Sequence, residues 1–508
     1  MKRLTSRLLN RALSSIEWLG NRLPDPIVLY ALLAAAVPFM SALAVGIGWA
    51  REHPVTGDMV RAINLLDKEQ MQRMWTEAVD NFTSFAPLGA VLVTVMGIGV
   101  AERSGLIDHV LRLTVQKAPR SLVTVIIVFA GIMSSMAADS GYVVLTPLGA
   151  VVFAGLGRHP LAGLAAAFAG VAGGFSANLL ITSLDPLLSG FTDEAARLYL
   201  TDYAVTPDAN YFFMIASTVL ITLLGWAITE WIVEPRLGKW NPANALTEEK
   251  EETSTTQPQQ IRALTASLVA VFACITGLLF MTLPENALLR DEEENLVPFV
   301  GSLVPIIAIS FLIPGTVYGI VSRSITSTKD LADMLADSMA TMGGYVVLAF
   351  AAAQFIAWFG WSNLGLLTAL EGAAFLQKLD LGSLPVLLTF VWMAAAINLV
   401  IGSASAKWGI MATVFVPMFM ILGITPETTQ AAYRVGDSIT NMITPLNPYF
   451  PIILSFALKY DPKLKMGTLV ATMLPYSIAF AIGWCILFSV WYGLGLPLGP
   501  GAPIHLIP

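Results

Sequence analysis

Five ionisable side chains lie within long apolar runs of this 508-residue sequence. They are Asp139, Asp185, Lys407, Arg434 and Asp437. Several of the runs are about 20 residues long, which is the length that spans a bilayer, and a charge inside a membrane is costly. We therefore take these five residues as functional candidates. Arg434 and Asp437 are three residues apart, so they share a helix face and are able to form an ion pair.

Two of the apolar runs are interrupted by small and polar residues. The interruptions are Ala-Ala-Asp-Ser-Gly at 137–141 and Gly-Ser-Ala-Ser-Ala-Lys at 402–407. A non-helical break at membrane depth is tolerated only where protein buries it or where it lines a watery cavity. Carbonyls at such a break, with Ser, Thr and Asn oxygens, suit a hard monovalent cation such as Na⁺. Helix N-termini suit an anionic substrate group.

Polar side chains near the breaks form two groups of candidate cation ligands. The first group is Asp139, Ser140, Ser176 and Asn178. The second group is Ser403, Ser405, Ser438, Thr440 and Asn441. Trp408 follows the second break and offers an aromatic face. Together with Arg434, it suits a ligand that carries an aromatic ring and a carboxylate.

The composition is that of a membrane protein. Hydrophobic residues make up 56% of the chain and charged residues 12%, about half the charged share of a typical soluble domain. The two cysteines lie in apolar runs, and the four histidines lie in loops or the tail. These positions argue against a disulfide framework, a zinc site and a catalytic histidine. We expect no enzyme activity, no organic cofactor and no nucleic-acid partner.

The apolar runs predict an all-α polytopic protein with nine transmembrane helices and two re-entrant hairpins. We divide the chain into a cytoplasmic amphipathic N-terminus, a first repeat, a cytoplasmic linker, an unpaired span, a second repeat and a periplasmic tail. These are residues 1–25, 26–233 with a hairpin at 121–156, 234–262, 262–283, 297–493 with a hairpin at 385–422, and 494–508.

The basic residues give this layout an orientation. With the N-terminus in the cytoplasm, 19 of the 28 Lys and Arg residues fall inside, seven fall outside, and Lys407 and Arg434 lie at membrane depth. This distribution follows the positive-inside rule.

A sequence motif occurs twice at an offset of 262 residues. Residues 174–186 and 436–448 share the pattern G-x-S-x-[NT]-x3-T-x-L-[DN]-P, with six of thirteen positions identical. One unpaired span separates the two halves, and an odd number of spans inverts the second half relative to the first. Such inverted repeats are typical of secondary transporters, which place substrate and ion sites where broken helices meet near the midplane.

Four stretches of the sequence resemble the p-aminobenzoyl-glutamate transporter (AbgT) family. They are SMAADSGYVVLTPLGA, GGFSANLLITSLDPLLSG, NLVIGSASAKWGIMATVFVPM and YRVGDSITNMITPLNPYFPII. The resemblance covers essentially the whole chain. It implies a homodimer in the bacterial inner membrane, with a transport core and an outer scaffold in each protomer. It also implies import of p-aminobenzoyl-glutamate, and for some members export of sulfonamide antimetabolites.

The resemblance also implies which residues act in transport. Carried over by motif, they are Asp185, Ser405, Trp408, Pro426, Arg434, Asp437 and Pro445. The resulting hypothesis is a cation-coupled transporter of p-aminobenzoyl-glutamate or sulfonamide-like compounds. Two rivals are an ion channel and an intramembrane aspartyl protease that uses Asp139, Asp185 or Asp437. The sequence leaves the direction of transport and the choice between Na⁺ and H⁺ open.

Overall fold

The computed structural model describes most of the chain. The described residues are 24–52, 57–116, 119, 121–137, 140–240, 258–284, 286–291, 297–444, 447 and 449–506. Asp139 and Pro445 lie outside them, as do most of the N-terminal segment 1–25 and residues 241–257 of the linker. The predicted roles of these segments stay predictions.

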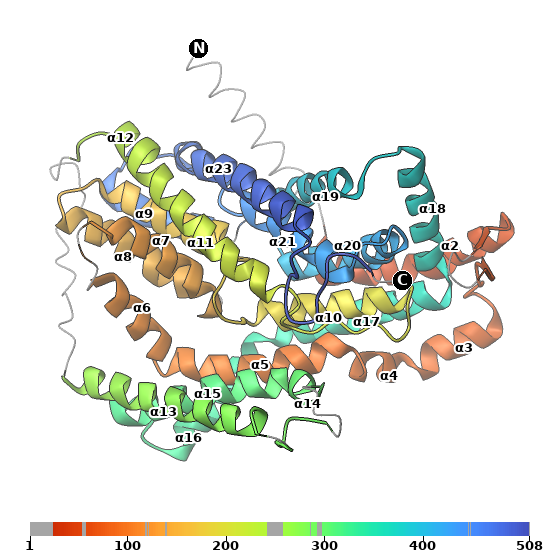
Figure 1. Ribbon diagram of the computed structural model, residues 1–508, viewed down its shortest axis with the longest axis horizontal. Coiled ribbons are helices and arrows are strands. Elements are labelled where there is room, and N and C mark those ends of the chain that lie inside the picture. The colour runs from red at the N-terminus through yellow and green to blue at the C-terminus, as the bar shows by residue number, and fades with distance from the viewer. Residues whose placement is uncertain are drawn as a thin grey trace, which may run out of the picture.

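The described residues are mostly helical, which confirms the predicted all-α class (Figure 1). The first half contains the helices α2 (Pro26–Gly46), α3 (Lys68–Thr76), α4 (Ala78–Thr83), α5 (Ala86–Arg103), α6 (Leu106–Gln116), α7 (Val123–Met133), the 3₁₀ turn η1 (Ser134–Ala137), α8 (Ser140–Gly155), α9 (Pro160–Phe168), the π-helical turn η2 (Ala169–Gly173), α10 (Leu184–Arg197), α11 (Tyr211–Ile228), the π-helical turn η3 (Thr229–Val233) and α12 (Glu234–Leu237).

The second half is also helical. It contains α13 (Pro258–Thr282), α14 (Val297–Gly301), α15 (Leu303–Ser322), α16 (Thr328–Thr341), α17 (Gly343–Trp361), α18 (Leu364–Lys378), α19 (Ser383–Asn398), α20 (Ala404–Ile421), α21 (Pro426–Thr440), α22 (Phe450–Tyr460) and α23 (Met466–Gly493). Among the described residues, two short strands are the one sheet element. Strands β1 (Ala50–Glu52) and β2 (Met59–Arg61) pair antiparallel, with Ala50 opposite Arg61, and sequence analysis did not predict them.

Seven helices of the described chain are long and apolar enough to cross a membrane. They are α2, α11 with its continuation to Leu237, α13, α15, α17, α20 and α23. The pair α5 and α6 raises the number to eight if this bent pair, with an angle of 59°, is one span. Helix α20 is one of the seven, although we predicted it as part of the re-entrant hairpin 385–422, so six of the seven correspond to predicted spans. The two predicted spans that remain besides the α5–α6 pair, 160–182 and 428–456, are broken helices. The first is interrupted between η2 and α10 and the second between α21 and α22, so that their parts are too short to cross a membrane singly. The nine-span topology therefore stays a prediction.

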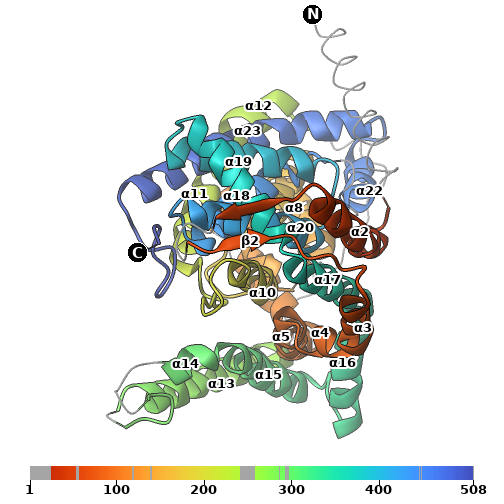
Figure 2. The ribbon, with the colours of Figure 1, turned by 90° about the vertical axis from the view of Figure 1, so that its right-hand side faces the viewer.

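The helices form two regions of different character (Figures 1 and 2). Helices α13, α15 and α16 lie along one side, where α15 and α16 contact α5 and α13 contacts α15. Large apolar side chains of α13, such as Phe272 and Phe280, are exposed. An apolar surface of this kind is suited to lipid rather than to water. The other region contains α7 to α11 and α19 to α23, and it holds the candidate site residues.

Each broken helix packs on the predicted hairpin of the other half. The first predicted hairpin is α7 with α8, and the second is α19 with α20. Helix α10, which follows the first break, contacts α20 and α21, while α22, which follows the second break, contacts α8 and α9. The breaks are thereby enclosed by protein, which is where non-helical backbone is tolerated at membrane depth.

Local sequence explains where the central helices start and stop. Pro160 and Pro426 occupy the first turns of α9 and α21, where the missing N–H of proline does no harm. The side chain of Thr425 caps α21 by accepting a hydrogen bond from the Thr428 N–H. Ser403 caps α20 in the same way through the Ala406 N–H. Helix α20 therefore starts at Ala404, inside the stretch 402–407 that we expected to be non-helical.

Candidate functional site

The first broken segment lies between η2 and α10. Glycines permit close packing before the break, since a Cβ atom on Gly170 would lie 2.4 Å from the Val128 carbonyl oxygen. After the break, Asp185 occupies the first turn of α10 and is fully buried. Its Oδ2 accepts hydrogen bonds from the N–H (2.6 Å) and the hydroxyl (2.9 Å) of Thr182. A helix N-terminus attracts negative charge, and Asp185 occupies this position in α10.

Asp185 forms a buried ion pair with Arg434 of α21. The Arg434 Nη1 atom lies 2.6 Å from Asp185 Oδ1, and the two side chains are 3% and 0% exposed. The pair joins the two halves of the chain across 249 residues. Arg434 Nε is buried without a hydrogen-bond partner in the described structure. A buried donor without a partner is costly, which makes this nitrogen a candidate contact for a ligand oxygen.

Asp437 forms a second buried ion pair, with Lys407. The Lys407 Nζ atom lies 2.5 Å from Asp437 Oδ1, and the side chains are 0% and 2% exposed. The Asn398 Oδ1 atom accepts a further hydrogen bond from Nζ at 2.5 Å. Arg434 and Asp437 therefore each pair with another residue, although their spacing allows them to pair with one another. Both residues lie on α21, but α10 and α20 bring an opposite charge to each, and this arrangement leaves neither Asp185 nor Lys407 uncompensated.

The first group of candidate cation ligands is partly assembled. Asn178 Nδ2 donates to the Ser135 hydroxyl (2.9 Å) and to the Ile132 carbonyl (3.4 Å). Ser176 contributes its backbone, because its N–H donates to the Ser438 hydroxyl at 3.2 Å. The Ser176 hydroxyl itself is buried without a hydrogen-bond partner in the described structure. Ser140 begins α8, and its side chain is not described.

The second group is assembled around Asn398, a residue that sequence analysis did not select. Its Nδ2 donates to Thr440 Oγ1 at 2.9 Å, to Asn441 Oδ1 at 2.8 Å and to the Asp437 carbonyl at 2.7 Å. The structure therefore brings Thr440 and Asn441 together with the Lys407 pair. An amide within the apolar run 385–398 was the signal that could have identified Asn398.

Ser403 and Ser405 lie at the start of α20. Their hydroxyls are 3.4 Å apart, and Ser403 also serves as the helix cap. Among the described residues, neither serine forms a hydrogen bond with the amide and carboxylate oxygens around Asn398.

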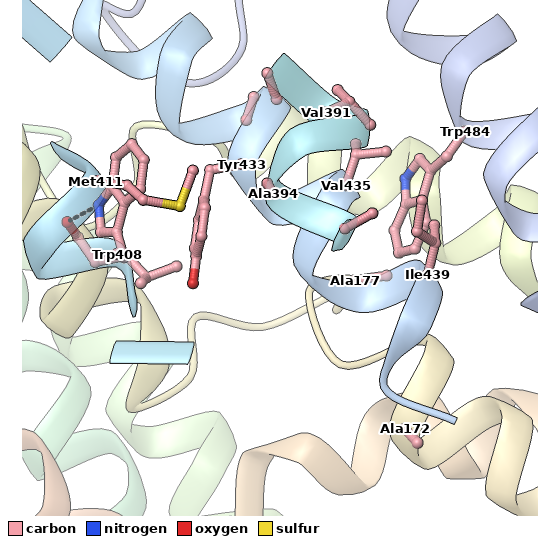
Figure 3. Close-up of a cluster of buried hydrophobic side chains, with 14 of the residues drawn as sticks. Ala172, Ala177, Val391, Ala394, Trp408, Met411, Tyr433, Val435, Ile439 and Trp484 are labelled. Atoms are coloured by element: carbon pink, nitrogen blue, oxygen red, sulfur yellow. Dashed lines mark hydrogen bonds between the residues drawn. The ribbon is translucent and has the colours of Figure 1, made fainter. Parts of the chain in front are cut away.

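Trp408 is enclosed by protein in this structure. Its ring stacks on Tyr433, with centroids 4.4 Å apart, and it is fully buried. Its Nε1 donates to the Thr192 hydroxyl (2.9 Å) and to the Leu188 carbonyl (3.2 Å) of α10. Figure 3 shows Trp408, Met411 and Tyr433 together on one side of the cluster, with Val435, Ile439 and Trp484 on the other. The ring that we expected to face a ligand contacts Tyr433 instead and holds α10, α20 and α21 together.

Pro426 lies at the opposite end of α21 from the ion pairs. Asp437 follows Pro426 by eleven positions, which correspond to about 16 Å along a helix axis. The C-terminal tail docks at this end, where the Thr425 N–H donates to the Ile504 carbonyl. Pro426 is therefore placed to fix the start of α21 rather than to contact a ligand beside Arg434.

The described residues include no group of three or more His, Cys, Asp or Glu side chains that could hold a metal ion. The two oxygen groups near the breaks are built from amides, hydroxyls and backbone carbonyls. Such neutral oxygens are hard ligands, which suit Na⁺ rather than a transition metal.

Fold and site together define a class. Long apolar helices, exposed apolar surface and broken helices with buried charges are features of membrane transport proteins. The comparisons with known proteins identify the family. The model of the AbgT putative transporter family matches residues 11–506, and the chain belongs to this family. It is a multi-pass membrane transporter and not an enzyme, which excludes the aspartyl protease.

Relatives share nearly the whole length of the chain. The p-aminobenzoyl-glutamate transport protein of Escherichia coli (strain K12) is 36% identical over 489 residues, 96% of this chain and 95% of that protein. A crystal structure of the YdaH transporter of Alcanivorax borkumensis, described as having an unusual topology, is 44% identical with a TM-score of 0.90. The match covers 100% of the YdaH chain and 94% of this chain.

MtrF of Neisseria gonorrhoeae, described as illuminating a class of antimetabolite efflux pumps, is also 44% identical. Its TM-score is 0.92, with 97% of this chain and 100% of MtrF covered.

Proposed function

We propose that this protein is a cation-coupled secondary transporter of p-aminobenzoyl-glutamate or of sulfonamide-like aromatic antimetabolites. The observation that carries the proposal is Arg434. It is a buried guanidinium held by Asp185 through one nitrogen, with a second nitrogen, Nε, that has no protein partner in the described structure. An arginine held in this way is prepared to bind a carboxylate or a sulfonyl oxygen, because its charge is in place before the ligand arrives.

The aromatic part of the ligand is the second element of this proposal. Trp408 and Tyr433 form a stacked pair, and Tyr433 precedes Arg434 on α21. An aminobenzoyl or sulfanilyl ring beside this pair would gain aromatic contact while its acidic group reached Arg434. Because Trp408 is fully buried here, ring contact requires that α10 or α20 shift.

Cation coupling is supported by the first broken segment. The Ser176 hydroxyl is a buried oxygen without a partner, and Asn178 and Ser135 lie in the same part of the chain. A hydroxyl without a partner, close to amide and carbonyl oxygens at a helix break, is suited to Na⁺. A proton carried by Asp185 or Asp437 is the alternative source of coupling.

We further propose the architecture that fits this function. The two halves form an inverted repeat with nine spans and two re-entrant hairpins, and the protein works as a homodimer in the bacterial inner membrane with its N-terminus in the cytoplasm. The distribution of Lys and Arg supports the orientation. The hydrogen bond between Ser176 and Ser438 supports the repeat, because it joins residues that are 262 apart, the offset of the repeated motif.

Transport into sealed proteoliposomes tests the proposed function. Flux of radiolabelled p-aminobenzoyl-glutamate and of a labelled sulfonamide would be measured with a Na⁺ gradient and a pH gradient imposed separately. We expect saturable flux of at least one ligand, driven by one of the gradients and lost in Arg434→Met. Flux that does not saturate would favour a channel, and absence of gradient-dependent flux of both ligand classes would contradict the proposal.

A further inference from the structure

The first broken segment lies between η2 and α10, and the second lies between α21 and α22. Each is accompanied by the same set of polar contacts, which we call the polar frame, and the residues that form it are related by the repeat offset. In the first, Asn178 Nδ2 donates to Ser135 Oγ at 2.9 Å. In the second, Asn398 Nδ2 donates to Thr440 Oγ1 at 2.9 Å. Thr440 follows Asn178 by 262 residues, and Asn398 follows Ser135 by 263. The contact between the two positions is therefore the same in both segments, but the amide and the hydroxyl have changed places: the amide is at the later position in the first segment and at the earlier position in the second.

A backbone contact follows the same offset. Asn178 Nδ2 donates to the Ile132 carbonyl at 3.4 Å, and Thr440 Oγ1 donates to the Ala395 carbonyl at 3.2 Å. Ile132 and Ala395 are also 263 residues apart. The two oxygen groups thus have the same arrangement of contacts, so the residues that differ between them indicate how their functions differ.

The largest difference is the ion pair of the second segment. Lys407 and Asp437 correspond, at offsets of 263 and 262, to Val144 and Phe175 of the first segment. Both charged residues are absent from the first copy, and apolar residues stand in their places. The ammonium of Lys407 contacts the Asp437 carboxylate and the Asn398 amide oxygen, both at 2.5 Å. The Tyr433 ring centroid lies 5.5 Å away.

Stability alone does not account for this pair. A buried ion pair contributes no more to stability than well-packed apolar residues of similar volume, and often less. The first segment uses apolar residues at the matching positions. The surroundings of the ammonium, by contrast, are those of a bound monovalent cation: a carboxylate oxygen, an amide oxygen and an aromatic face.

We propose that the Lys407 ammonium is a tethered cation that occupies the ion site of the second broken segment, so that an exchangeable cation binds at the first segment alone. The proposal rests on the cation coupling proposed above. Lys407 lies in the first turn of α20, beside the break, so this charge stays with the hairpin whenever the hairpin moves. The Lys407 ammonium is then the fixed cation at the second break, and the exchangeable cation binds at the first.

Cation-specific thermal stabilisation tests the proposal without any transport substrate. Full-length wild type, Lys407→Met, Asp437→Asn and the double variant would be purified in detergent. Their unfolding temperatures would be compared in NaCl and in choline chloride at equal ionic strength. Lys407→Met leaves a buried carboxylate and an amide oxygen without a cation, so we expect Na⁺ to bind there. In NaCl, the unfolding temperature of Lys407→Met should rise by about 2 °C or more beyond the rise seen for wild type, when the Na⁺ concentration is about ten times the Kd.

The other variants distinguish a cation site from a structural pair. Asp437→Asn keeps the ammonium and loses the carboxylate, so it should be destabilised with no additional response to Na⁺. The double variant should return to the wild-type response. Equal responses of Lys407→Met and Asp437→Asn would show that the pair is structural and would overturn the proposal.

A second neutral variant protects the test against misfolding. Lys407→Gln would be assayed in the same way, and binding of radioactive Na⁺ should show one additional ion per protomer compared with wild type. If neither neutral variant folds even in saturating NaCl, Na⁺ does not replace the ammonium and the proposal is wrong. The flux assay is independent, so a protein that transports neither ligand class still gives a clear answer here.

Discussion

The two broken segments of this transporter carry the same polar frame and different charges. In the first, Asp185 follows the break and pairs with Arg434 of α21. In the second, the charges come before or beside the break, because Arg434 and Asp437 lie on α21 and Lys407 on α20. The repeated motif thus accompanies two similar breaks, and each buried ion pair has one member on α21. The frame is symmetric, whereas the candidate substrate contacts belong mainly to the second half.

The largest effect is expected at the pair that joins the two segments. Asp185→Ala would leave the Arg434 guanidinium buried without an anion, at a cost of about 3–5 kcal/mol. We expect a large decrease in unfolding temperature in detergent and flux at background. Thr182→Val removes one hydrogen bond to Asp185 and serves as the control, with a much smaller loss. A stable Asp185→Ala protein would show that the ion pair is not required to join the halves.

Arg434→Lys separates binding from stability at the same pair. Lysine keeps a positive charge for Asp185 but has no counterpart of Nε and no planar fork. We expect ligand affinity to fall about 10-fold or more, which corresponds to about 1.4 kcal/mol, with a smaller change in unfolding temperature. Equilibrium binding of the labelled ligand to purified protein measures this. Unchanged affinity would exclude Nε as a ligand contact.

Asn398→Ala and Asn178→Ala compare the two polar frames directly. Asn398 donates three hydrogen bonds and accepts one from Lys407, so its loss should cost about 1–3 kcal/mol, more than the loss of Asn178. The effect on the cation dependence of flux should be larger for Asn178→Ala than for Asn398→Ala. Asn178→Ala is expected to raise the cation concentration needed for half-maximal flux, and Asn398→Ala to change it less. The opposite order of cation effects would place the exchangeable ion in the second segment.

Ser176→Ala changes the first frame with little change in folding. The hydroxyl has no partner in the described structure, so its removal should alter stability by no more than about 0.5 kcal/mol. If the hydroxyl binds the coupling cation, half-maximal flux should require several-fold more cation. Ser438→Ala is the matched control, because its hydroxyl already accepts from the Ser176 N–H. An unaltered cation dependence in Ser176→Ala would remove this oxygen from the proposed site.

The smallest effect is expected at Asp330, far along the chain from both breaks and at the start of α16. Hydrogen bonds from the side chain and the N–H of Thr326, and from the Ser327 N–H, lower the pKa of its carboxyl to about 2. A lowered pKa means that the carboxylate stabilises the fold above its usual pKa and that this contribution is lost as pH falls toward 2. Asp330→Asn should therefore lower the unfolding temperature slightly and equally from pH 5 to 8. A difference that varies within that range would contradict the assignment.

Much of the site was predictable because its signals are local. Charges in apolar runs, small and polar residues at 137–141 and 402–407, and the motif repeated at 262 residues are all properties of short stretches. They identified Asp185, Arg434, Asp437, Asn178 and Thr440, which the structure places at the breaks. The start of α20 was predicted less well, since the Ser403 cap lets the helix begin inside the polar stretch.

The sequence by itself determined the membrane character of the chain and its repeated motif, because hydropathy and short residue patterns act over a few turns of helix. The breaks inside the predicted spans 160–182 and 428–456 became apparent only in the structure. Tertiary structure decided which charges meet. Spacing on one helix allows Arg434 to pair with Asp437, but the packing of α10 and α20 on α21 brings Asp185 to the first and Lys407 to the second. Burial requires a compensating partner for each charge, and only the folded chain determines which partner is within reach.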